Sequence, residues 1–356
     1  DMGAYEYHTG DCFARLNSGQ VYATVQAAVD AASLPTDTIK VAGVCAGVQT
    51  FTEGYALTQT VYLSKPLTLR GGYTTTNWVS PTTLTVLDPQ GQGRGIYITG
   101  TSAITVDGFV IRNVQVISAD GGGLYIAGAY SPTLQNLIVY SNTAAYGGGL
   151  ALAGGNARLF NNTFVSNTAT ADNGGGGLYL AGGSPVVNSS LFVGNGHGGV
   201  SAAESVGNLA YNDVWGQPGG LDYVGGVTAG PSSMSVDPRF VDPATFNFHL
   251  RYDSPVLHRG DPNTTAAWDV EGDPRPLGQG PDIGADEAAL YPNVTLSASP
   301  DNNVMGIVGR SYVFTHTLLN DGTLVSDTFK LSHVLTVTGP SSGWSVNYDT
   351  RDITLM

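Results

Sequence analysis

The chain has 356 residues and a formal net charge of −14, which excludes the basic footprint that nucleic-acid binding and attachment to anionic membranes require. Charged residues make up only 12% of the chain and glycine accounts for 49 residues, roughly half and twice their usual shares. No apolar run approaches the ~20 residues needed to span a bilayer as a helix. An acidic surface rich in small polar residues is typical of a secreted or cell-surface protein.

The N-terminal residues contain a phrase that returns near the end of the chain. "DMGAYE" at 1–6 matches "DIGADE" at 282–287. We therefore interpret residues 1–19 as the end of a preceding unit, and the chain as a window from a longer modular polypeptide. The absence of a signal peptide agrees with a mature chain or a fragment.

A helix is predicted over residues 20–36, because Val25, Val29 and Ala32 recur at helical spacing. Its place before the first strands suggests a cap on a repeat structure. The two cysteines, Cys12 and Cys45, lack the spacing of a metal site. They are either buried thiols or a disulfide, and we expect the disulfide because the composition indicates an extracellular protein.

Residues 37–216 carry an internal repeat. Phrases such as "GGGLYIAG", "GGGLALAG" and "GGGGLYLAGG" place apolar residues 28, 26, 28 and 22 positions apart, at Ile96, Leu124, Leu150, Leu178 and Val200. Each repeat holds two or three short alternating runs separated by turns. Three short strands per repeat describe one coil of a parallel β-helix, in which equivalent apolar residues stack from coil to coil.

Glycine and asparagine are expected at the corners of these coils. The glycines allow tight turns, including positions with positive φ, and we assign corner roles to Gly123, Gly149, Gly177 and Gly199. A second recurring residue is Asn, at Asn113, Asn142, Asn167, Asn195 and Asn212. We expect these side chains to stack in a ladder, with hydrogen bonds between amides and with left-handed backbone conformations. A flexible linker would not keep two such ladders in phase.

The pattern fades after Trp215. Residues 217–290 are rich in Pro, Gly and Asp, and we expect them to wrap the far end of the solenoid. Residues 291–356 alternate like antiparallel strands, which predicts a partial immunoglobulin-like β-sandwich, since about 100 residues make a complete one. The fold class is therefore all-β: a right-handed parallel β-helix with a capping helix and a partial sandwich.

Several of these phrases resemble known families. The pairing of G-G-G-L with F-V-S-N or F-V-G-N resembles the repeats of chlamydial polymorphic outer-membrane proteins. "YATVQAAVDAAS" and the following strands resemble the N-terminal end of right-handed, pectate-lyase-like β-helix surface proteins of bacteria, and "DPRFVDP" to "GPDIGADE" is similar to the segment that closes them. The resemblance implies the fold and an extracellular setting, and it does not imply an activity, because this fold carries many.

A catalytic cluster is not evident on the coils. Asp107, Asp120 and Asp172 are spaced so that adjacent coils do not bring three acids together, although cleavage of sugars on this fold needs neighbouring carboxylates. We therefore expect no catalytic residues. A polysaccharide lyase or hydrolase is the least favoured function.

Acidic residues concentrate instead in the closing segment. Asp269, Glu271 and Asp273 have a D-x-E-G-D spacing that is able to wrap a hard cation such as Ca²⁺. The favoured alternative is a turn-rich loop with Asx turns and Asp–Arg pairs to Arg239, Arg259 or Arg275. Otherwise no cofactor is expected.

The function that these features favour is a non-enzymatic structural module of a bacterial surface layer, stalk, sheath or filament, joined head to tail. Its partners would be further copies or other surface proteins. The alternative is an adhesin or carbohydrate-binding protein, for which Tyr125 and Tyr179, at equivalent points of two coils, would supply a sugar-stacking strip. We favour the alternative that these tyrosines point inward as core residues.

Overall fold

The computed structural model describes residues 11–288, apart from 53–55, 101–102, 129, 205–206 and 265, together with four short strands beyond residue 293. The chain divides into two compact units, Asp1–Ala289 and Leu290–Met356. The phrase at residues 1–6 lies outside the described residues.

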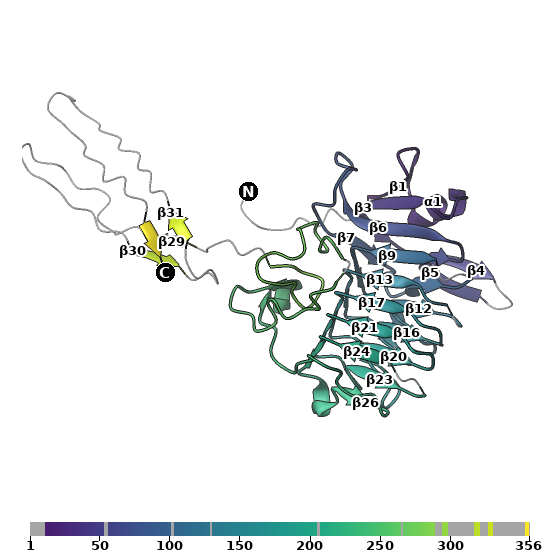
Figure 1. Ribbon diagram of the computed structural model, residues 1–356. Coiled ribbons are helices and arrows are strands. Elements are labelled where there is room, and N and C mark those ends of the chain that lie inside the picture. Colours follow the sequence, from purple (N-terminus) through teal and green to yellow (C-terminus); the bar gives the residue numbers. More distant parts are fainter. Residues whose placement is uncertain are drawn as a thin grey trace, which may run out of the picture. The chain divides into compact units, whose positions relative to one another are not determined.

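The first unit is a right-handed parallel β-helix whose coils visit three sheets in turn (Figure 1). Sheet A contains β3 (Thr38–Ala46), β6 (Leu67–Tyr73), β9 (Ile104–Asp107), β13 (Thr133–Gln135), β17 (Arg158–Phe160), β21 (Val186–Asn188) and β24 (Asn208–Ala210). Sheet B continues from β3 through β7 (Thr85–Asp88), β10 (Phe109–Arg112), β14 (Ile138–Tyr140), β18 (Thr163–Val165), β22 (Leu191–Val193) and β25 (Asp213–Trp215).

Sheet C completes each coil. It contains β4 (Gln49–Thr52), β5 (Ala56–Leu63), β8 (Arg94–Ile98), β12 (Leu124–Ile126), β16 (Leu150–Leu152), β20 (Leu178–Leu180), β23 (Val200–Ala202) and β26 (Tyr223–Val224). A small sheet between B and C is formed by β11 (Gln115–Val116), β15 (Thr143–Ala144) and β19 (Thr168–Ala169). β4 is antiparallel to β5, and the other neighbours in sheet C are parallel.

The register of sheet C agrees with the apolar repeat of the sequence. Leu124 pairs with Ile96 on one side and with Leu150 on the other, and the column continues through Leu178 and Val200. All five side chains are fully buried. The inward side chains of successive coils thus form the continuous apolar column that stabilises the solenoid.

The predicted asparagine ladder is divided between two corners. Asn142, Asn167 and Asn195 form one buried column, in which Nδ2 of each donates to Oδ1 of the next at 3.0 and 3.1 Å. The column ends on Gln217, whose Oε1 accepts the Asn195 N–H. Asn212 belongs to a second column at the corner between sheets A and B, where its Oδ1 accepts the Ser190 N–H.

Two details of the predicted ladder are wrong. Asn113 is exposed and lies one residue before the column, so the equivalent of Asn142 is Val114, whose N–H donates to Asn142 Oδ1. The left-handed conformation belongs to the residue before each ladder asparagine, with φ of 53° at Ser141 and 52° at Ser166. The ladder amides therefore satisfy buried backbone groups beside a turn that another residue makes.

In the glycine phrases, too, glycine is needed for different physical reasons at different positions. Positive φ occurs at the start of the phrase, with values of 68° at Gly121 and 61° at Gly147. At the later corner positions, a side chain would collide with neighbouring atoms, and this explains the glycines at Gly123, Gly149, Gly177 and Gly199. A Cβ on Gly149 would lie 2.6 Å from the Gly177 carbonyl oxygen and 2.8 Å from Phe164 Cδ1. These corner glycines thus allow neighbouring coils and the asparagine column to approach closely.

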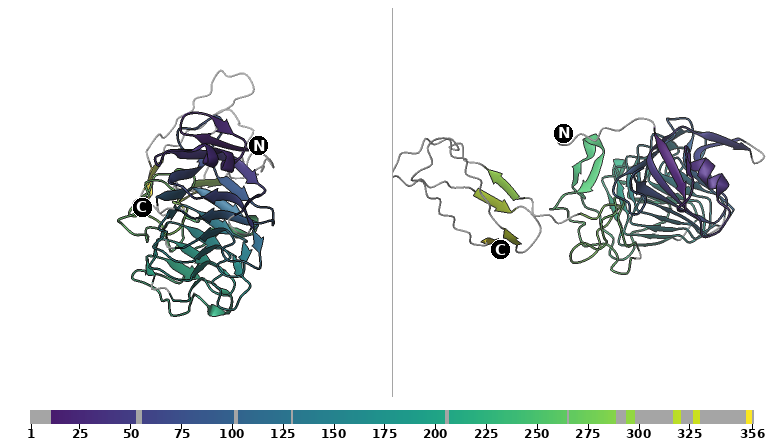
Figure 2. Two further views of the ribbon diagram at one scale, coloured as in Figure 1. Left: turned by 90° about the vertical axis from the view of Figure 1, so that its right-hand side faces the viewer. Right: turned by 90° about the horizontal axis from the view of Figure 1, so that it is seen from above.

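The N-terminal end of the solenoid is covered. β1 (Cys12–Leu16) pairs antiparallel with β2 (Val21–Tyr22) and with β3, and α1 (Val25–Ala31) packs beside them (Figure 2). The helix is shorter than the predicted 20–36, and its N-cap is Thr24, whose hydroxyl accepts the Ala27 N–H. The Gln26 side chain pairs with both the N–H and the C=O of Tyr62, at 2.8 and 3.3 Å, and so closes the edge of β5.

The Cys12–Cys45 disulfide is confirmed. It joins β1 to the part of β3 that has already turned into sheet B. The covalent link therefore fastens the cap to the first coil.

The closing segment covers the far end only in part: β26 adds to sheet C, and residues 231–236 lie along the last coil, where the Tyr211 and Val214 N–H groups donate to the Pro231 and Met234 carbonyls. The rest of the segment does not wrap this end, although the sequence led us to expect it. After η1 (Pro218–Gly220) and β26, it runs back beside the coils through β27 (Phe240–Asp242), η2 (Pro243–Thr245) and β28 (Asn247–Leu250) (Figure 1). The Ala285 N–H donates to Thr163 Oγ1 at 2.9 Å, and Gly284 donates to the Ser189 carbonyl. The segment thus braces the corner between sheets A and B.

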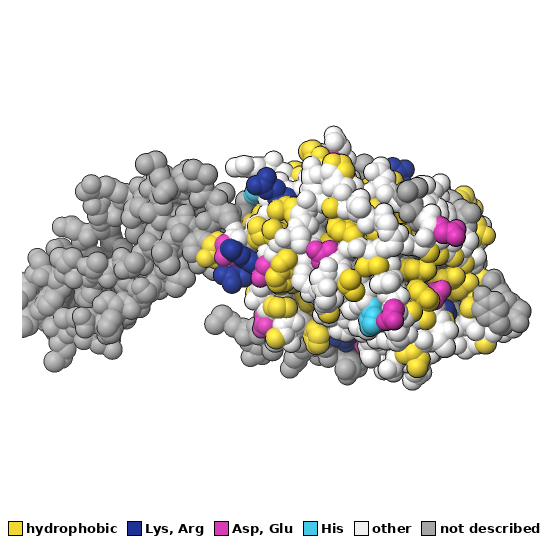
Figure 3. Space-filling model, turned by 90° about the horizontal axis from the view of Figure 1, so that it is seen from below, with side chains coloured by type: hydrophobic (Ala, Val, Ile, Leu, Met, Phe, Trp, Pro, Cys, Tyr) yellow, Lys and Arg dark blue, Asp and Glu magenta, His cyan; other side chains and the backbone are white. Residues whose placement is uncertain are grey.

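The far end of the solenoid terminates in the last strands of the three sheets, and residues 231–236 line those of sheets A and B in part. β24 and β26 each have a neighbour on one side only among the described residues. Seen from this end, the described surface carries mainly uncharged and hydrophobic side chains, with scattered acidic ones and a few Lys, Arg and His side chains (Figure 3).

The second unit is described only as two antiparallel pairs. They are β29 (Val294–Ser297) with β30 (Thr317–Asn320), and β31 (Asp327–Phe329) with β32 (Ile353–Leu355). The immunoglobulin-like assignment of residues 291–356 stays a prediction.

Candidate functional site

The outer face of sheet A carries rows of polar and aromatic side chains. Side chains alternate along each strand, so Arg158 and Phe160 of β17 point outward while Leu159 is buried. In register with Arg158 lie Thr133 and Val186, and in register with Phe160 lies Asn188. Consecutive coils thus place these side chains in two parallel rows.

The closing segment forms the second wall beside these rows. Asn188 Nδ2 donates to Asp261 Oδ2 at 2.6 Å, and the Asp261 N–H donates to Ser189 Oγ at 2.8 Å. Thr264 Oγ1 donates to Asn161 Oδ1 at 3.0 Å. Residues 261–264 are therefore held against the coils by side chains of the coils themselves.

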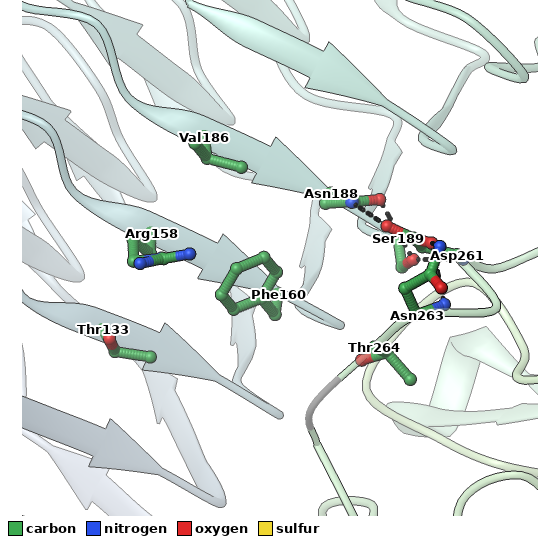
Figure 4. A pocket seen from close by; sticks show the side chains of 9 residues that line it. All are labelled: Thr133, Arg158, Phe160, Val186, Asn188, Ser189, Asp261, Asn263 and Thr264. Carbon is green, nitrogen blue, oxygen red and sulfur yellow. Dashed lines mark hydrogen bonds between the residues drawn. The ribbon is translucent and has the colours of Figure 1, made fainter.

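Between the two walls is a groove of about 480 Å³ (Figure 4). Its lining residues are Thr133, Arg158, Phe160, Val186, Asn188, Ser189, Asp261, Asn263 and Thr264. The Arg158 guanidinium carbon lies 5.7 Å from the centre of the half-buried Phe160 ring. The groove thus combines an apolar ring face with hydroxyl, amide and guanidinium groups, which suits a neutral or acidic sugar better than an apolar ligand.

The groove does not have the carboxylate pair that glycoside hydrolysis needs. Among the described residues that line it, Asp261 carries the one carboxylate, and that group is bonded to Asn188 and Asn263. Further along the same face, Asp107 is buried against Arg70, with 3.2 Å between Nε and Oδ2. Burial raises the Asp107 pKa, and the Arg70 charge opposes that shift.

Basic residues gather on sheet A at the capped end of the solenoid. Arg15, Lys40 and Arg70 occupy consecutive strands in register. Arg15 and Lys40 line a second hollow of about 580 Å³ with Trp78 and Val79. The Lys40 pKa is lowered, first by burial and then by the charges of Arg70 and Arg15. This hollow is positive in a chain that is strongly acidic.

Tyr125 and Tyr179 lie on the outer face of sheet C, so the alternative that placed them in the core is wrong. Both are half-buried. Tyr125 continues a row of rings through Tyr97, Tyr62 and Phe51, with centroids 5.3, 5.7 and 4.6 Å apart, whereas Tyr179 packs on Tyr146. Most of each ring is covered by its neighbours, which leaves little free face for stacking on a sugar.

The structure places the predicted cation ligands in different roles. Asp269 is buried, and its Oδ1 accepts the N–H groups of Glu271, Gly272 and Asp273 at 2.8–2.9 Å. Its Oδ2 accepts the Glu287 N–H. Asp269 therefore shapes the loop, as the Asx-turn alternative requires, and Asp269, Glu271 and Asp273 do not converge on one point.

The Asx-turn alternative also predicted that aspartates of the closing segment pair with arginines. Arg239 does pair with Asp253, at 3.0 Å. Arg275 pairs with Glu287 at 2.8 Å, with both side chains fully buried, and it donates to the Gly284 and Ala285 carbonyls. Arg275 thereby holds the "DIGADE" phrase in place.

Glu271 has a partner that the sequence pattern did not indicate. Its carboxylate lies 2.6 Å from His249 Nε2 on β28. The Glu271 hydrogen bond raises the His249 pKa to about 9, against the opposing effect of burial. His249 is distant in sequence and follows no metal-binding motif, so only the fold brings it to the loop.

Asp213 is a further buried acid, at the start of β25. Its Oδ1 accepts the Val236 N–H, while its Oδ2 has no hydrogen-bond partner among the described residues. Burial first, and then the neighbouring charges of Asp222 and Asp237, raise its pKa to about 7 against the lowering effect of the Val236 hydrogen bond.

Comparison with known families agrees with this architecture. A family model described as the right handed beta helix region matches residues 74–232, which include most of the coils. No curated protein and no solved structure matches the chain. In the part of the chain that the structure describes, no helix has the length and apolar character needed to cross a membrane. The matched region and the parallel sheets together show that this chain contains a right-handed parallel β-helix.

Proposed function

We propose that the chain is a non-enzymatic extracellular structural module that associates end to end with further copies of itself. The observation that carries this proposal is the asymmetry of the solenoid ends. The N-terminal end is covered by β1, α1 and the Gln26 side chain. At the other end, β26 of sheet C has a neighbour on one side only among the described residues, and residues 231–236 line the last strands of the other two sheets. Uncovered strand edges are either protected or used for association.

The charge distribution supports joining of unlike ends. Between Arg158 and Arg239 the sequence has no Lys or Arg and five acids, Asp172, Glu204, Asp213, Asp222 and Asp237. Arg15, Lys40 and Arg70 lie in register near the capped end. Contacts that bring this basic row against the acidic last coils of a second copy would favour head-to-tail association over contacts between like ends.

The disulfide supports the extracellular setting, because such bonds persist in oxidising compartments. The fully buried columns and the brace of the closing segment make the coils a stiff element, as a stalk or filament subunit requires.

The test is the state of association in solution. Sedimentation velocity over a range of protein concentrations, with electron microscopy of the same samples, is expected to give linear oligomers that dissociate as salt rises. The test variant is Leu221→Lys, because Leu221 is exposed near the edge-strand end. The control is Ile117→Lys, because Ile117 is an exposed apolar residue on the side of the coils. We expect L221K to weaken association at least tenfold and I117K to leave it unchanged. A monomer at every concentration, or equal effects of the two changes, would exclude this assembly.

A second function is favoured by the groove in Figure 4. We propose that it binds a glycan, because Phe160 and Arg158 present a ring face and a guanidinium beside the Asn188 and Asp261 pair.

A glycan array should select ligands, and calorimetry would then measure their binding to two variants. Phe160→Ala removes the ring of the groove, and the control Phe246→Ala removes an exposed ring away from the groove. Loss of binding at least tenfold in F160A alone supports the groove. Binding that survives F160A, or an array without ligands, rejects it.

A further inference from the structure

The closing segment contains a cluster of titratable side chains that neither proposed function uses. One suitable atom from each of His249, Glu271 and Asp286 lies within 4.8 Å of the others. No other group of three or more His, Cys, Asp or Glu side chains in the described parts of the chain comes this close together. The three residues come from β28, from the loop after Asp269, and from the "DIGADE" phrase.

The imidazole is oriented for a ligand at Nε2. Its Nδ1 faces Asn247 Oδ1, a carbonyl oxygen that only accepts hydrogen bonds, so Nδ1 carries the proton and donates it. Nε2 then points to the carboxylates. A second-shell oxygen that fixes the other ring nitrogen is the usual arrangement for a metal-binding histidine.

The carboxylates are also held in place. Asp286 is buried and its Oδ2 accepts the Leu250 N–H at 2.7 Å. Glu271 is positioned by the three N–H bonds that Asp269 accepts from its loop. The side chains of His249 and Glu271 are 30% and 21% exposed, so an ion has a path from solvent to these ligand atoms.

The local charge favours a cation. One imidazole faces the carboxylates of Asp269, Glu271 and Asp286, and Asp273 adds a fourth acid to the same surroundings. One protonated His cannot balance these charges. A divalent ion bound at Nε2 of the neutral imidazole would bring two positive charges in place of one and so offset more of them.

We propose that His249, Glu271 and Asp286 bind a divalent transition-metal ion, with zinc as the best fit. One imidazole and two carboxylates match the ligand preferences of zinc, whereas calcium takes oxygen ligands alone. Ligand atoms about 2.1 Å from a zinc ion are roughly 3–4 Å apart, which small side-chain rotations here would provide. The ion would tie β28 to the loop and to the end of the closing segment.

The test uses the full chain, stripped with a chelator and dialysed. Calorimetry with zinc chloride is expected to give one site per chain, and zinc is expected to raise the melting temperature by several degrees. His249→Gln should weaken zinc binding at least tenfold. His258→Gln is the matched control, because His258 lies in the same segment and contacts Gly280 and Asp282 instead.

Glu271→Gln provides a second variant if H249Q does not fold, since an amide retains a hydrogen bond to the imidazole while it removes the charge. No heat and no thermal shift with zinc in the native chain would overturn the proposal, as would equal zinc affinity in H249Q and H258Q. Calcium binding that Asp273→Asn removes and H249Q does not would place the ion at the oxygen-only loop site and likewise overturn it.

Discussion

Asn167 shows how one buried amide connects three coils. Its Oδ1 accepts the Asn142 N–H at 3.2 Å, and its Nδ2 donates to the Val139 carbonyl and to Asn195 Oδ1 at 2.8 and 3.1 Å. Asn167→Ala would leave these buried groups unpaired, which we expect to lower the free energy of unfolding by about 2–4 kcal/mol. The measurement is urea denaturation followed by circular dichroism.

The control for this change is Asn113→Gly, because Asn113 is exposed, the bond from its side chain to Asp88 Oδ1 lies at the surface, and its φ of 59° is one that glycine adopts without strain. Its effect should stay within about 0.5 kcal/mol. If N113G destabilised the protein as much as N167A, Asn113 would belong to the buried column after all.

The buried carboxyl of Asp213 leads us to expect an unusual pH dependence of the folding stability. Its pKa is raised from 3.8 to about 7 in the folded chain, so the folded state binds this proton more tightly than the unfolded state does. Stability should therefore fall as pH rises from about 4 to about 7, by up to roughly 1.4 kcal/mol per pH unit, and then level off.

Asp213→Asn keeps an oxygen for the Val236 N–H and removes the charge. Thermal melts should show the variant equal to the native chain at pH 4 and more stable at pH 8. A native chain that is at least as stable as D213N at pH 8 would mean that Asp213 is not held in a site unfavourable to its charge.

At the scale of elements, the disulfide is the feature whose removal is simplest to interpret. It closes a loop with a sequence separation of 33 residues between β1 and β3. The loss of that constraint on the unfolded chain corresponds to about 3–4 kcal/mol. We expect Cys12→Ser with Cys45→Ser to lower the melting temperature and to increase hydrogen exchange in β1 and α1 first.

Exchange in the last coils, β24 to β26, serves as the internal reference for that experiment, since these strands do not contact the cap. Equal loss of protection at both ends would contradict a local role for the disulfide.

The sequence predicts the coil elements well and the corners less well. Inward apolar residues repeat at one position of each coil, so the Leu124 and Leu150 column can be read from spacing alone. The two corner columns are similar in composition, and Asn113 lies one residue from a true column position, so spacing alone does not separate them. The same limit applies to the glycines, where positive φ and crowding fall at adjacent positions.

The loop at Asp269 illustrates a different limit. Its D-x-E-G-D spacing fits an Asx turn as well as it fits a cation loop, and the backbone N–H groups take up the Asp269 oxygens. His249 reaches Glu271 only because the closing segment folds back on itself. Contacts of this kind leave no periodic signal in a sequence.

At the scale of the whole molecule, the closing segment is predicted to stabilise the coils from the side. We expect a chain that ends at residue 236 to melt roughly 5–15 °C below one that ends at residue 288, because it loses several buried hydrogen bonds to Asn161, Thr163 and Ser189. Calorimetry on the two chains makes the comparison. Equal melting temperatures would mean that the segment only lies against the coils.

The return of this segment along the solenoid also bears on cooperativity. In a simple solenoid each coil contacts only its neighbours, so the ends fray and unfolding proceeds coil by coil. Here bonds such as Ala285 to Thr163 join residues 122 positions apart in the chain, and Gly272 packs closely on Pro81 near the first coils. Coils that are distant from one another are therefore linked through a common partner, and the first unit should unfold in one sharp transition, as a globular domain does.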